Sequence, residues 1–548
     1  MRSAFALRLL ALLMGALSSC TSGGDGSVSV VAITTTSANF AVVGNFYTST
    51  LVAMGGTPPY TWAAVGGLPA WVSLDPSTGV LTGTPTASDV GNFTPTFRVI
   101  DSTGAIGQGS VFLAVHPRTD IGSVDNSTPP VPGNSSSNRP AISNDGRFIG
   151  FASLASNLVS GISGSQIYIH DRQTNLTSLV SRNSSGTPAD PAATTSSPSI
   201  SGNGRFIAFV SNATNLVAGA SGFQIYLRDT QTGVTSLVSK DVSTGNPASA
   251  GSINGSPSIS GNGRFIAYVS DATNLVSGIT GQQVYLYDTQ TTMAFPNGQT
   301  ILISKNNNVT PLKGDGASSS PSISRDGCYV AFASLSTNLI APPPGNQQIY
   351  VRGPLPGPGI CPGTEKTSLV SKDNSGSPIP GNGFSSSPSM NSNGRFVAFT
   401  SAASNLLAGV SGQQIYLHDR ASGANGTTSL ISKDNSGPPV PGNGNSSSPS
   451  ISDDACYVAF ASLSTNFGTA GGNQQIYTRG PLPAPAICPG TEQTSLVSKD
   501  SSGTLAGNSG SDTPSTDADG GYIAFASQST NLVSPSLGNQ QIYVRATP

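Results

Sequence analysis

Side chains that could carry acid–base chemistry are few in this chain. The two glutamates, Glu365 and Glu492, each follow Cys-Pro-Gly-Thr at equivalent places in two copies of a repeated segment. A glycosidase needs two carboxylates that flank one bond, and residues in separate repeats are poorly placed for that. The chain also lacks a Gly-x-Ser-x-Gly elbow, a metal-binding histidine cluster and a phosphate loop. The sequence therefore predicts no catalytic residue, no cofactor and no metal site.

Three histidines complete the set of candidate bases. His116 lies at the junction of two unlike modules, whereas His170 and His418 share a position in Tyr-x-His-Asp that Arg228 and Tyr287 occupy in other repeats. A position that accepts His, Arg or Tyr is typical of a partly exposed strand residue. We therefore expect these histidines to be structural.

Asp and Asn residues recur before Gly in the repeats, and Asp517 and Asp519 occupy one such turn. These residues bond to their own backbone, and Gly accepts positive φ, so we assign them to turns rather than to a calcium site. A second Asn recurs in Asn-Leu-Val or its variants. Because it is used identically in every repeat, we predict that it builds the fold: Asn157, Asn215, Asn274, Asn338, Asn405, Asn466 and Asn531.

Four of the five cysteines fall at equivalent places in two repeats. We predict disulfides between Cys328 and Cys361 and between Cys456 and Cys488, because an exported chain meets an oxidising compartment. Zinc is the alternative, but no His or third Cys lies nearby in the sequence.

The fifth cysteine, Cys20, ends an export signal. Arg2 and Arg8 precede the apolar stretch LLALLMGAL, which is too short to span a bilayer, and LSSC follows. This ending resembles the lipobox of bacterial lipoproteins, which implies a signal peptide at 1–19, lipidation of Cys20 and a linker at 20–27. In that pattern an Asp after the Cys retains the protein at the inner membrane. Thr21 stands there, so we expect a cell-envelope location at the outer membrane; an ordinary secretory signal is the alternative.

The composition limits the partners. Charged residues make up 9% of the 548 residues and the net charge is −2, so no basic stripe is available to neutralise phosphates, and we expect no nucleic-acid partner. Short β-rich runs between turn-forming clusters predict an all-β fold. We expect a monomer held at the membrane by its lipid anchor.

Residues 28–116 carry short alternating strands separated by Pro, Gly and Asn turns, the pattern of a β-sandwich. The stretch LPAWVSLDPSTGVLTGTPT followed by GNFTPTFRVIDSTG resembles the He_PIG family of Ig-like modules of bacterial surface proteins. Trp62 and Trp71 both lie here; we expect them to pack in the core rather than to form a sugar platform. Asp101 alone cannot supply the six to eight oxygens that calcium requires.

From residue 118 onward the chain repeats every 58–67 residues, starting at Pro140, Pro198, Pro257, Pro321, Pro388, Pro449 and Pro514. Each of the seven units has four strand-like runs, for example PSIS, RFIAFVS, QIYLRDT and TSLVSK, which predicts a seven-bladed β-propeller over 118–548. An open solenoid is the alternative.

The two ends of the array complete one unit. The seventh unit stops after its third strand, and residues 119–127, TDIGSVDNS, have the sequence of a fourth strand. We predict that this N-terminal strand joins the last blade and closes the ring, which removes an exposed sheet edge.

The motifs S-x-D-G-R-F-I-A-F and Q-I-Y-L-x-D resemble the propeller repeat of TolB and its WD40-like (PD40) relatives. The resemblance implies the fold and no particular activity. We expect a non-catalytic binding or scaffold protein with a protein or polysaccharide ligand; an exported hydrolase or lyase acting on polysaccharide is the alternative. Because loops on a rigid scaffold carry recognition residues, we expect the ligand on the face made by the long loops.

Overall fold

The computed structural model describes residues 30–241, 243–249, 257–290, 298–341, 343–355, 361–468, 472–483, 488–534 and 538–547. The predicted signal peptide and the lipidation site Cys20 lie outside these residues. Within them, no helix is long and apolar enough to cross a membrane. The described chain forms two units, residues 30–38, 48–83 and 93–112, and residues 39–47, 84–92 and 113–547.

The N-terminal strands are short. They form three three-stranded sheets, ordered β10-β9-β5, β3-β7-β6 and β2-β11-β8, and the pair β1-β4. Their bounds are β1 (Ala32–Ile33), β2 (Ala41–Val42), β3 (Tyr47–Thr50), β4 (Ala53–Met54), β5 (Thr61–Gly66), β6 (Val72–Leu74), β7 (Val80–Gly83), β8 (Gly91–Phe93), β9 (Thr96–Ile100), β10 (Ile106–Ser110) and β11 (Leu113–His116), with a 3-10 turn at Ala87–Asp89.

The tryptophans and Asp101 have structural roles in this module. Trp62 is 4% exposed, and its ring lies so close to Gly79 that a side chain there would meet it at 2.9 Å, so this tryptophan packs in the core as predicted. Trp71 is partly buried. Asp101 is buried and accepts hydrogen bonds from the backbone N–H groups of Thr57, Thr103 and Ala105 at 2.7–2.9 Å, which ties a turn together.

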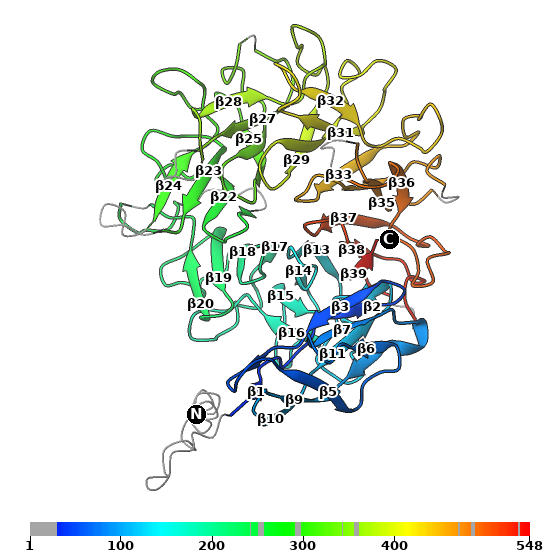
Figure 1. Ribbon diagram of the computed structural model, residues 1–548. Coiled ribbons are helices and arrows are strands. Elements are labelled where there is room, and N and C mark those ends of the chain that lie inside the picture. Colours follow the sequence, from blue (N-terminus) through cyan, green and yellow to red (C-terminus); the bar gives the residue numbers. More distant parts are fainter. Residues whose placement is uncertain are drawn as a thin grey trace. The chain divides into compact units, whose positions relative to one another are not determined.

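Seven four-stranded antiparallel sheets, here called blades 1 to 7, make up residues 119–547 (Figure 1). In blades 1 to 6 the strands follow chain order: blade 1 has β13 (Ser137–Ile142), β14 (Phe148–Ser153), β15 (Gln166–Asp171) and β16 (Leu176–Leu179), and blade 2 has β17 (Thr195–Ile200), β18 (Phe206–Ser211), β19 (Gln224–Asp229) and β20 (Val234–Leu237). Blade 3 has β21 (Ser258–Ile259), β22 (Phe265–Ser270), β23 (Gln283–Asp288) and β24 (Gln299–Leu302), and blade 4 has β25 (Ser318–Ile323), β26 (Val330–Ser334), β27 (Gln348–Gly353) and β28 (Lys366–Leu369). Blade 5 has β29 (Ser385–Met390), β30 (Phe396–Ser401), β31 (Gln414–Asp419) and β32 (Thr427–Leu430), and blade 6 has β33 (Ser446–Ile451), β34 (Val458–Ser462), β35 (Gln475–Gly480) and β36 (Gln493–Leu496).

Blade 7 contains β37 (Ser511–Thr516), β38 (Tyr522–Ser527), β39 (Gln541–Ala546) and β12 (Thr119–Ile121). Strand β12 pairs antiparallel with β39, in the register Thr119 opposite Arg545 and Ile121 opposite Tyr543. The predicted N-terminal closing strand is therefore confirmed, and it covers the sheet edge that β39 would otherwise expose.

The second and third strands of each blade are buried on both faces, because neighbouring blades cover them. Within a blade they stack an aromatic pair, for example Phe209 on Tyr226 with ring centroids 5.7 Å apart. Each apolar cluster combines residues of two successive blades, and one cluster joins blade 1 to blade 7 through Phe151 and Ile542. The cores between blades thus form a continuous ring.

Serine hydroxyls join the innermost strands. The Ser after the conserved Pro accepts the backbone N–H of the next blade's first strand, for example Ser322 from Met390 at 3.0 Å and Ser515 from Ile142 at 3.3 Å. At the junction of blades 1 and 2 the corresponding residue is Ala141, which has no hydroxyl to offer.

Candidate functional site

The turns between the first and second strands meet at the propeller axis and form a closed circle of backbone hydrogen bonds. We call this circle the axial ring. Each bond runs from an N–H of one blade to a C=O of the next: Asn144 to Gly202 at 2.9 Å, Gly202 to Gly261 at 2.9 Å, Gly261 to Arg325 at 2.9 Å, Asp326 to Ser392 at 3.1 Å, Ser392 to Asp453 at 3.2 Å, Asp454 to Ala518 at 3.2 Å and Ala518 to Asn144 at 3.1 Å. The last bond excludes the open solenoid.

The axial ring surrounds a polar hollow of about 690 Å³ lined by turn residues of blades 1 to 5, among them Asn144, Arg325 and Ser392. Arg325 of blade 4 reaches past blade 5, and its Nε lies 2.9 Å from Oδ1 of Asp453 in blade 6. Burial raises the pKa of the Asp453 carboxyl even though Arg325 opposes this shift.

Sequence reasoning missed this group of residues. The bonds of the axial ring use main-chain atoms only, so the side chains at the ring position are free to differ between blades. They are Asn144, Gly202, Gly261, Arg325, Ser392, Asp453 and Ala518. The sequence does contain a signal for these residues: in each repeat they stand directly before the Asp or Asn of the turn, and their identity varies from blade to blade.

The Asp and Asn residues one position later form the rim of the hollow and serve as turn residues, as predicted. Asp145 accepts the Ser143 hydroxyl at 2.6 Å and the Arg147 N–H at 3.0 Å, and Asn203 accepts the equivalent pair at 2.9 and 3.1 Å. Within the described residues, no three His, Cys, Asp or Glu side chains come together as metal ligands would.

Each glutamate is held in ion pairs with an arginine of its own blade and a lysine of the preceding crossover loop. Glu365 lies 2.7 Å from Arg352 and 3.4 Å from Lys305, and Glu492 lies 2.7 Å from Arg479.

The Tyr-x-His-Asp position is fully buried, which corrects the expectation of a partly exposed residue. His170 is 1% exposed and its Nδ1 lies 3.0 Å from the Thr177 hydroxyl; His418 is 2% exposed and makes the same contact with Thr428. Burial lowers the pKa of His170 to about 4 and that of His418 to about 3. Arg228 fills the same position and bonds Thr235 at 2.9 Å, so the position fastens the third strand to the fourth.

His116, the third candidate base, is also buried. Its Nδ1 lies 2.5 Å from Oδ2 of Asp120 and its Nε2 lies 2.7 Å from the carbonyl oxygen of Arg172. Both ring nitrogens are therefore occupied, which leaves neither free to act on a substrate.

The repeated Asn of Asn-Leu-Val has the structural role that we predicted. Its Nδ2 donates to a carbonyl of the preceding crossover loop and its Oδ1 accepts an N–H of that loop; in blade 5, Asn405 donates to Pro380 at 3.0 Å and accepts from Asn382 at 2.8 Å. The other six make the same pair of bonds: Asn157, Asn215, Asn274, Asn338, Asn466 and Asn531.

A further set of asparagines, not recognised from the sequence, protects the outer strands. Asn435, in the loop after blade 5, donates to the carbonyl of Thr494 at 2.8 Å and accepts its N–H at 2.6 Å. We call this arrangement an edge clamp, since Thr494 lies on the outermost strand of blade 6 and would otherwise expose unpaired backbone groups. The same pair of bonds recurs at Asn126, Asn307 and Asn374.

Both predicted disulfides are present, Cys328–Cys361 and Cys456–Cys488. Each joins the turn between the first two strands of a blade to the connection between its last two. Both connections therefore lie on one face, which we call the short-turn face; the remaining connections lie on the other, the long-loop face.

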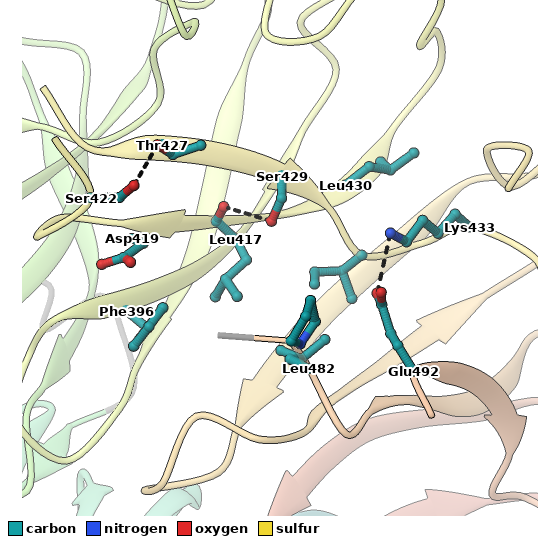
Figure 2. A pocket seen from close by; sticks show the side chains of 12 residues that line it. Phe396, Leu417, Asp419, Ser422, Thr427, Ser429, Leu430, Lys433, Leu482 and Glu492 are labelled. Carbon is teal, nitrogen blue, oxygen red and sulfur yellow. Dashed lines mark hydrogen bonds and ion pairs between the residues drawn. The ribbon is translucent and has the colours of Figure 1, made fainter. Parts of the chain in front are cut away.

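A second hollow, of about 220 Å³, lies between blades 5 and 6 (Figure 2). Leu417, Leu430 and Leu482 line its apolar part, and the ion pair of Lys433 with Glu492 at 3.1 Å lies at its edge. Equivalent residues line a hollow of about 240 Å³ between blades 1 and 2. Because the hollow recurs with the repeat, we attribute it to blade packing.

The long-loop face presents most of the exposed apolar side chains. Of the thirteen large apolar residues exposed in the described part of 118–547, eleven lie on its loops: Val131, Leu154, Phe223, Val309, Leu312, Leu335, Ile379, Phe384, Val440, Leu463 and Leu505. The other two, Leu176 and Val234, begin the outer strands β16 and β20. Apolar surface gathered on one face marks an interaction site more often than scattered residues do.

Five of these residues occupy one position of the crossover loop, and we call them the apolar crest: Val131, Leu312, Ile379, Val440 and Leu505. Each is held rigidly. Ile379, 57% exposed, donates its N–H to Oδ1 of Asp373 at 2.8 Å and accepts the N–H of Asp373 at 3.1 Å. The two remaining crossover loops place Thr187 and Asn246 there, so the crest follows five consecutive blade junctions.

Seven blades joined in a ring and an Ig-like module define the class: an all-β protein with a β-propeller. Residues 28–116 match the family model described as "Putative Ig domain". No curated protein matches the chain.

Solved structures similar to this chain are β-propeller proteins. An oligogalacturonate lyase in complex with manganese is 11% identical, with 92% of this chain and 98% of that chain covered and a TM-score of 0.44. The β-propeller domain of the Trilobed protease from Pyrococcus furiosus is 12% identical, with 75% and 94% covered and a TM-score of 0.41. The periplasmic gluconolactonase of Pseudomonas aeruginosa is 13% identical, with 79% and 95% covered and a TM-score of 0.33.

Proposed function

We propose that this protein is a non-catalytic lipoprotein of the cell envelope, anchored through Cys20, that binds a protein partner through the long-loop face of its propeller. The observation that carries the proposal is the concentration of eleven exposed apolar side chains on that face. One partner contributes ~800 Å² to a standard interface, so the bound protein would contact the loops of several blades at once.

The state of the acid–base side chains supports binding over catalysis. Glu365 and Glu492 are neutralised by ion pairs, and His170 and His418 are buried in contacts that hold the blades together. A general base must reach the proton that it removes. The two histidines are buried, and the partly exposed glutamates are each held by an arginine.

The experiment is site-specific photo-crosslinking in whole cells that express the full chain. A crosslinking residue at Ile379 should yield one discrete protein adduct, whereas the same residue at Thr187, its polar equivalent, and at Asn203 on the short-turn face should not. Equal crosslinking from all three positions, or from none, would contradict the proposal. Separately, Cys20→Ser should release the chain from membranes.

An exported polysaccharide hydrolase or lyase is the second candidate, favoured by one observation, the pairing of Arg325 with Asp453 beside the axial hollow. A carboxylate and a guanidinium at one opening could bind and polarise a sugar acid. Cleavage of a polysaccharide by the purified chain, lost in Asp453→Asn, would establish this function instead.

A further inference from the structure

The turn between the first and second strands of each blade begins with a residue whose side chain both donates one hydrogen bond and accepts another. In blade 1 the Ser143 hydroxyl donates to Oδ1 of Asp145 at 2.6 Å and accepts the N–H of Phe148 at 2.9 Å. The same two bonds recur in blades 2, 3, 4 and 6 at Ser201, Ser260, Ser324 and Ser452. In blade 5 the side-chain amide of Asn391 makes the same two hydrogen bonds: its Nδ2 donates to Oδ1 of Asn393 at 3.1 Å, and its Oδ1 accepts the N–H of Phe396 at 2.9 Å.

Blade 7 places Asp517 at this position. The residue is 3% exposed, and its Oδ1 accepts the N–H of Tyr522 at 3.0 Å, as the Ser hydroxyl does elsewhere. The rim residue that needs the donated hydrogen bond is itself a carboxyl, Asp519, which accepts the N–H of Gly521 at 2.9 Å. An ionised carboxylate has no hydrogen to donate, so a hydrogen bond between the side chains of Asp517 and Asp519, as in the other six blades, requires that the two carboxyls hold one proton between them.

The surroundings of Asp517 favour the protonated form. Burial raises the pKa of Asp517 to about 8, and the neighbouring carboxylate of Asp519 acts in the same direction; the N–H of Tyr522 and the guanidinium of Arg172 in blade 1 oppose this rise. Arg172 does not pair with Asp517 in an ion pair; its guanidinium lies over the ring of Tyr522 and donates to the carbonyl of Gly146 at 2.9 Å. Tyr522 and Tyr457 are the other ionisable groups that interact with Asp517 or Asp519, while Asp454 acts on Tyr457, and Asp145 and Asp120 act on Arg172.

The turn of blade 7 supplies two bonds of the axial ring. Ala518, between the two carboxyls, donates to Asn144 of blade 1 at 3.1 Å and accepts from Asp454 of blade 6 at 3.2 Å. We propose that Asp517 and Asp519 share a proton and act as a latch that holds the axial ring closed at blade 7, and that loss of this proton opens the ring there.

The direction of the pH dependence follows from linkage. A carboxyl that keeps its proton to a higher pH in the closed ring than in the open one stabilises the closed form at low pH and loses that effect as the pH rises towards about 8. One proton released on opening increases the open fraction by up to tenfold per pH unit in this range.

The test is hydrogen exchange of the full chain measured by mass spectrometry from pH 5.5 to 8.5, corrected for the intrinsic exchange rate. Protection of peptides that contain Ala518 and Asp454 should fall by up to tenfold per pH unit in the wild type. Peptides that contain Gly202 and Gly261, on the opposite side of the ring, should keep constant protection and serve as the internal control.

Two variants restore the donor that other blades use, Asp517→Ser and Asp517→Asn, and both should make the protection of Ala518 independent of pH. Asp145→Asn, a rim change already present in blades 2 and 3, should leave the wild-type dependence intact. Constant protection of Ala518 in the wild type, or an unchanged fall in a folded Asp517→Ser or Asp517→Asn chain, would overturn the latch. Infrared absorption of a protonated carboxyl at neutral pH, present in the wild type and missing in Asp517→Asn, provides a readout that needs no change in ring opening.

Discussion

The two faces of the propeller solve different problems with different atoms. On the short-turn face, main-chain bonds close the axial ring, so its side chains vary from Gly202 to Arg325 without loss of the circle. On the long-loop face, side chains such as Asn405 and Asn435 hold the loops and outer strands, so their identity repeats from blade to blade. A constant side chain therefore marks construction in this molecule, and variation marks positions that construction leaves free.

The apolar crest adds to this comparison. Its residues are apolar and exposed at five junctions, whereas the asparagines beside them hydrogen-bond to the crossover loops. The part of an apolar side chain that stays exposed in the folded chain adds nothing to its stability, because only apolar surface removed from water contributes. The long-loop face thus combines loops that are held by hydrogen bonds with exposed apolar side chains at one position of five of these loops.

The largest effect on stability should come from the short-turn face. Replacing both Cys328 and Cys361 with Ser removes a crosslink between residues 33 apart in sequence. The loop entropy predicts a loss of about 4 kcal/mol in the free energy of unfolding. Denaturant unfolding measures this loss of stability. The same double change at Cys456 and Cys488 serves as the matched comparison. If both variants lose less than 1 kcal/mol, the disulfides of the short-turn face do not make the largest contribution to stability.

Ring closure comes next. Replacing residues 119–121 with Gly-Ser-Gly removes the side chains by which β12 completes blade 7, including the packing of Ile121. We expect a loss of about 2–4 kcal/mol, the range for a lost buried side chain and its hydrogen bonds, together with aggregation through the exposed edge of β39. Thermal unfolding with light scattering tests this; a monomer as stable as the parent would show that the backbone ring suffices without the closing strand.

The edge clamps should have a smaller effect. Asn435→Ala leaves the N–H and C=O of Thr494 without partners, at a cost of about 1–2 kcal/mol. Asn203→Ala, on the short-turn face, tests whether loss of a turn asparagine lowers the free energy of unfolding by as much. If Asn435→Ala is neutral, side-chain identity is not what holds the outer strands.

The smallest effect on stability, and the largest on binding, should come from the crest. Ile379→Thr and Val440→Thr copy the polar residue found at Thr187 and should change the free energy of unfolding by less than about 0.5 kcal/mol. The same pair of changes should abolish the crosslinked adduct formed from Leu505. Loss of stability without loss of the adduct would assign the crest to folding.

The burial of His170 and His418 predicts how the free energy of unfolding changes at acid pH. The pKa of His170 is about 4 and that of His418 about 3 in the folded chain, both below the ordinary value, so the unfolded chain binds more protons as the pH falls below about 6.5. Stability should therefore fall as the pH drops from 6.5 to 4. His418→Arg, the residue of blade 2 at this position, should weaken that dependence in pH-controlled denaturant unfolding.

Features that depend on neighbours in sequence were predictable. Strand runs, turn aspartates and the Cys pairs each reflect local geometry or exact repetition, and the closing strand followed because residues 119–127 matched the fourth strand missing at the C-terminus. The repeated Asn of Asn-Leu-Val was assigned to construction from its constancy, although its two partners could be seen only in the fold.

The burial of His170 and His418 was predicted wrongly, because tolerance of His, Arg and Tyr indicated solvent. The structure shows another reason for that tolerance: His170 and Arg228 both reach the Thr of the neighbouring strand from a buried position. Exposure depends on what the next blade covers, and the sequence of one blade does not contain that information.

The sequence by itself determined the strand pattern, the number of blades, the cysteine pairing and the way the ends meet, since all of these repeat or pair along the chain. Only the tertiary structure decided which side chains share a space. Arg325 and Asp453 lie 128 residues apart and Ala518 and Asn144 lie still farther, yet a closed ring brings their turns to one axis. The physical reason is that the ring converts positions equivalent in the repeat into neighbours in space, whereas the chain separates them by whole blades.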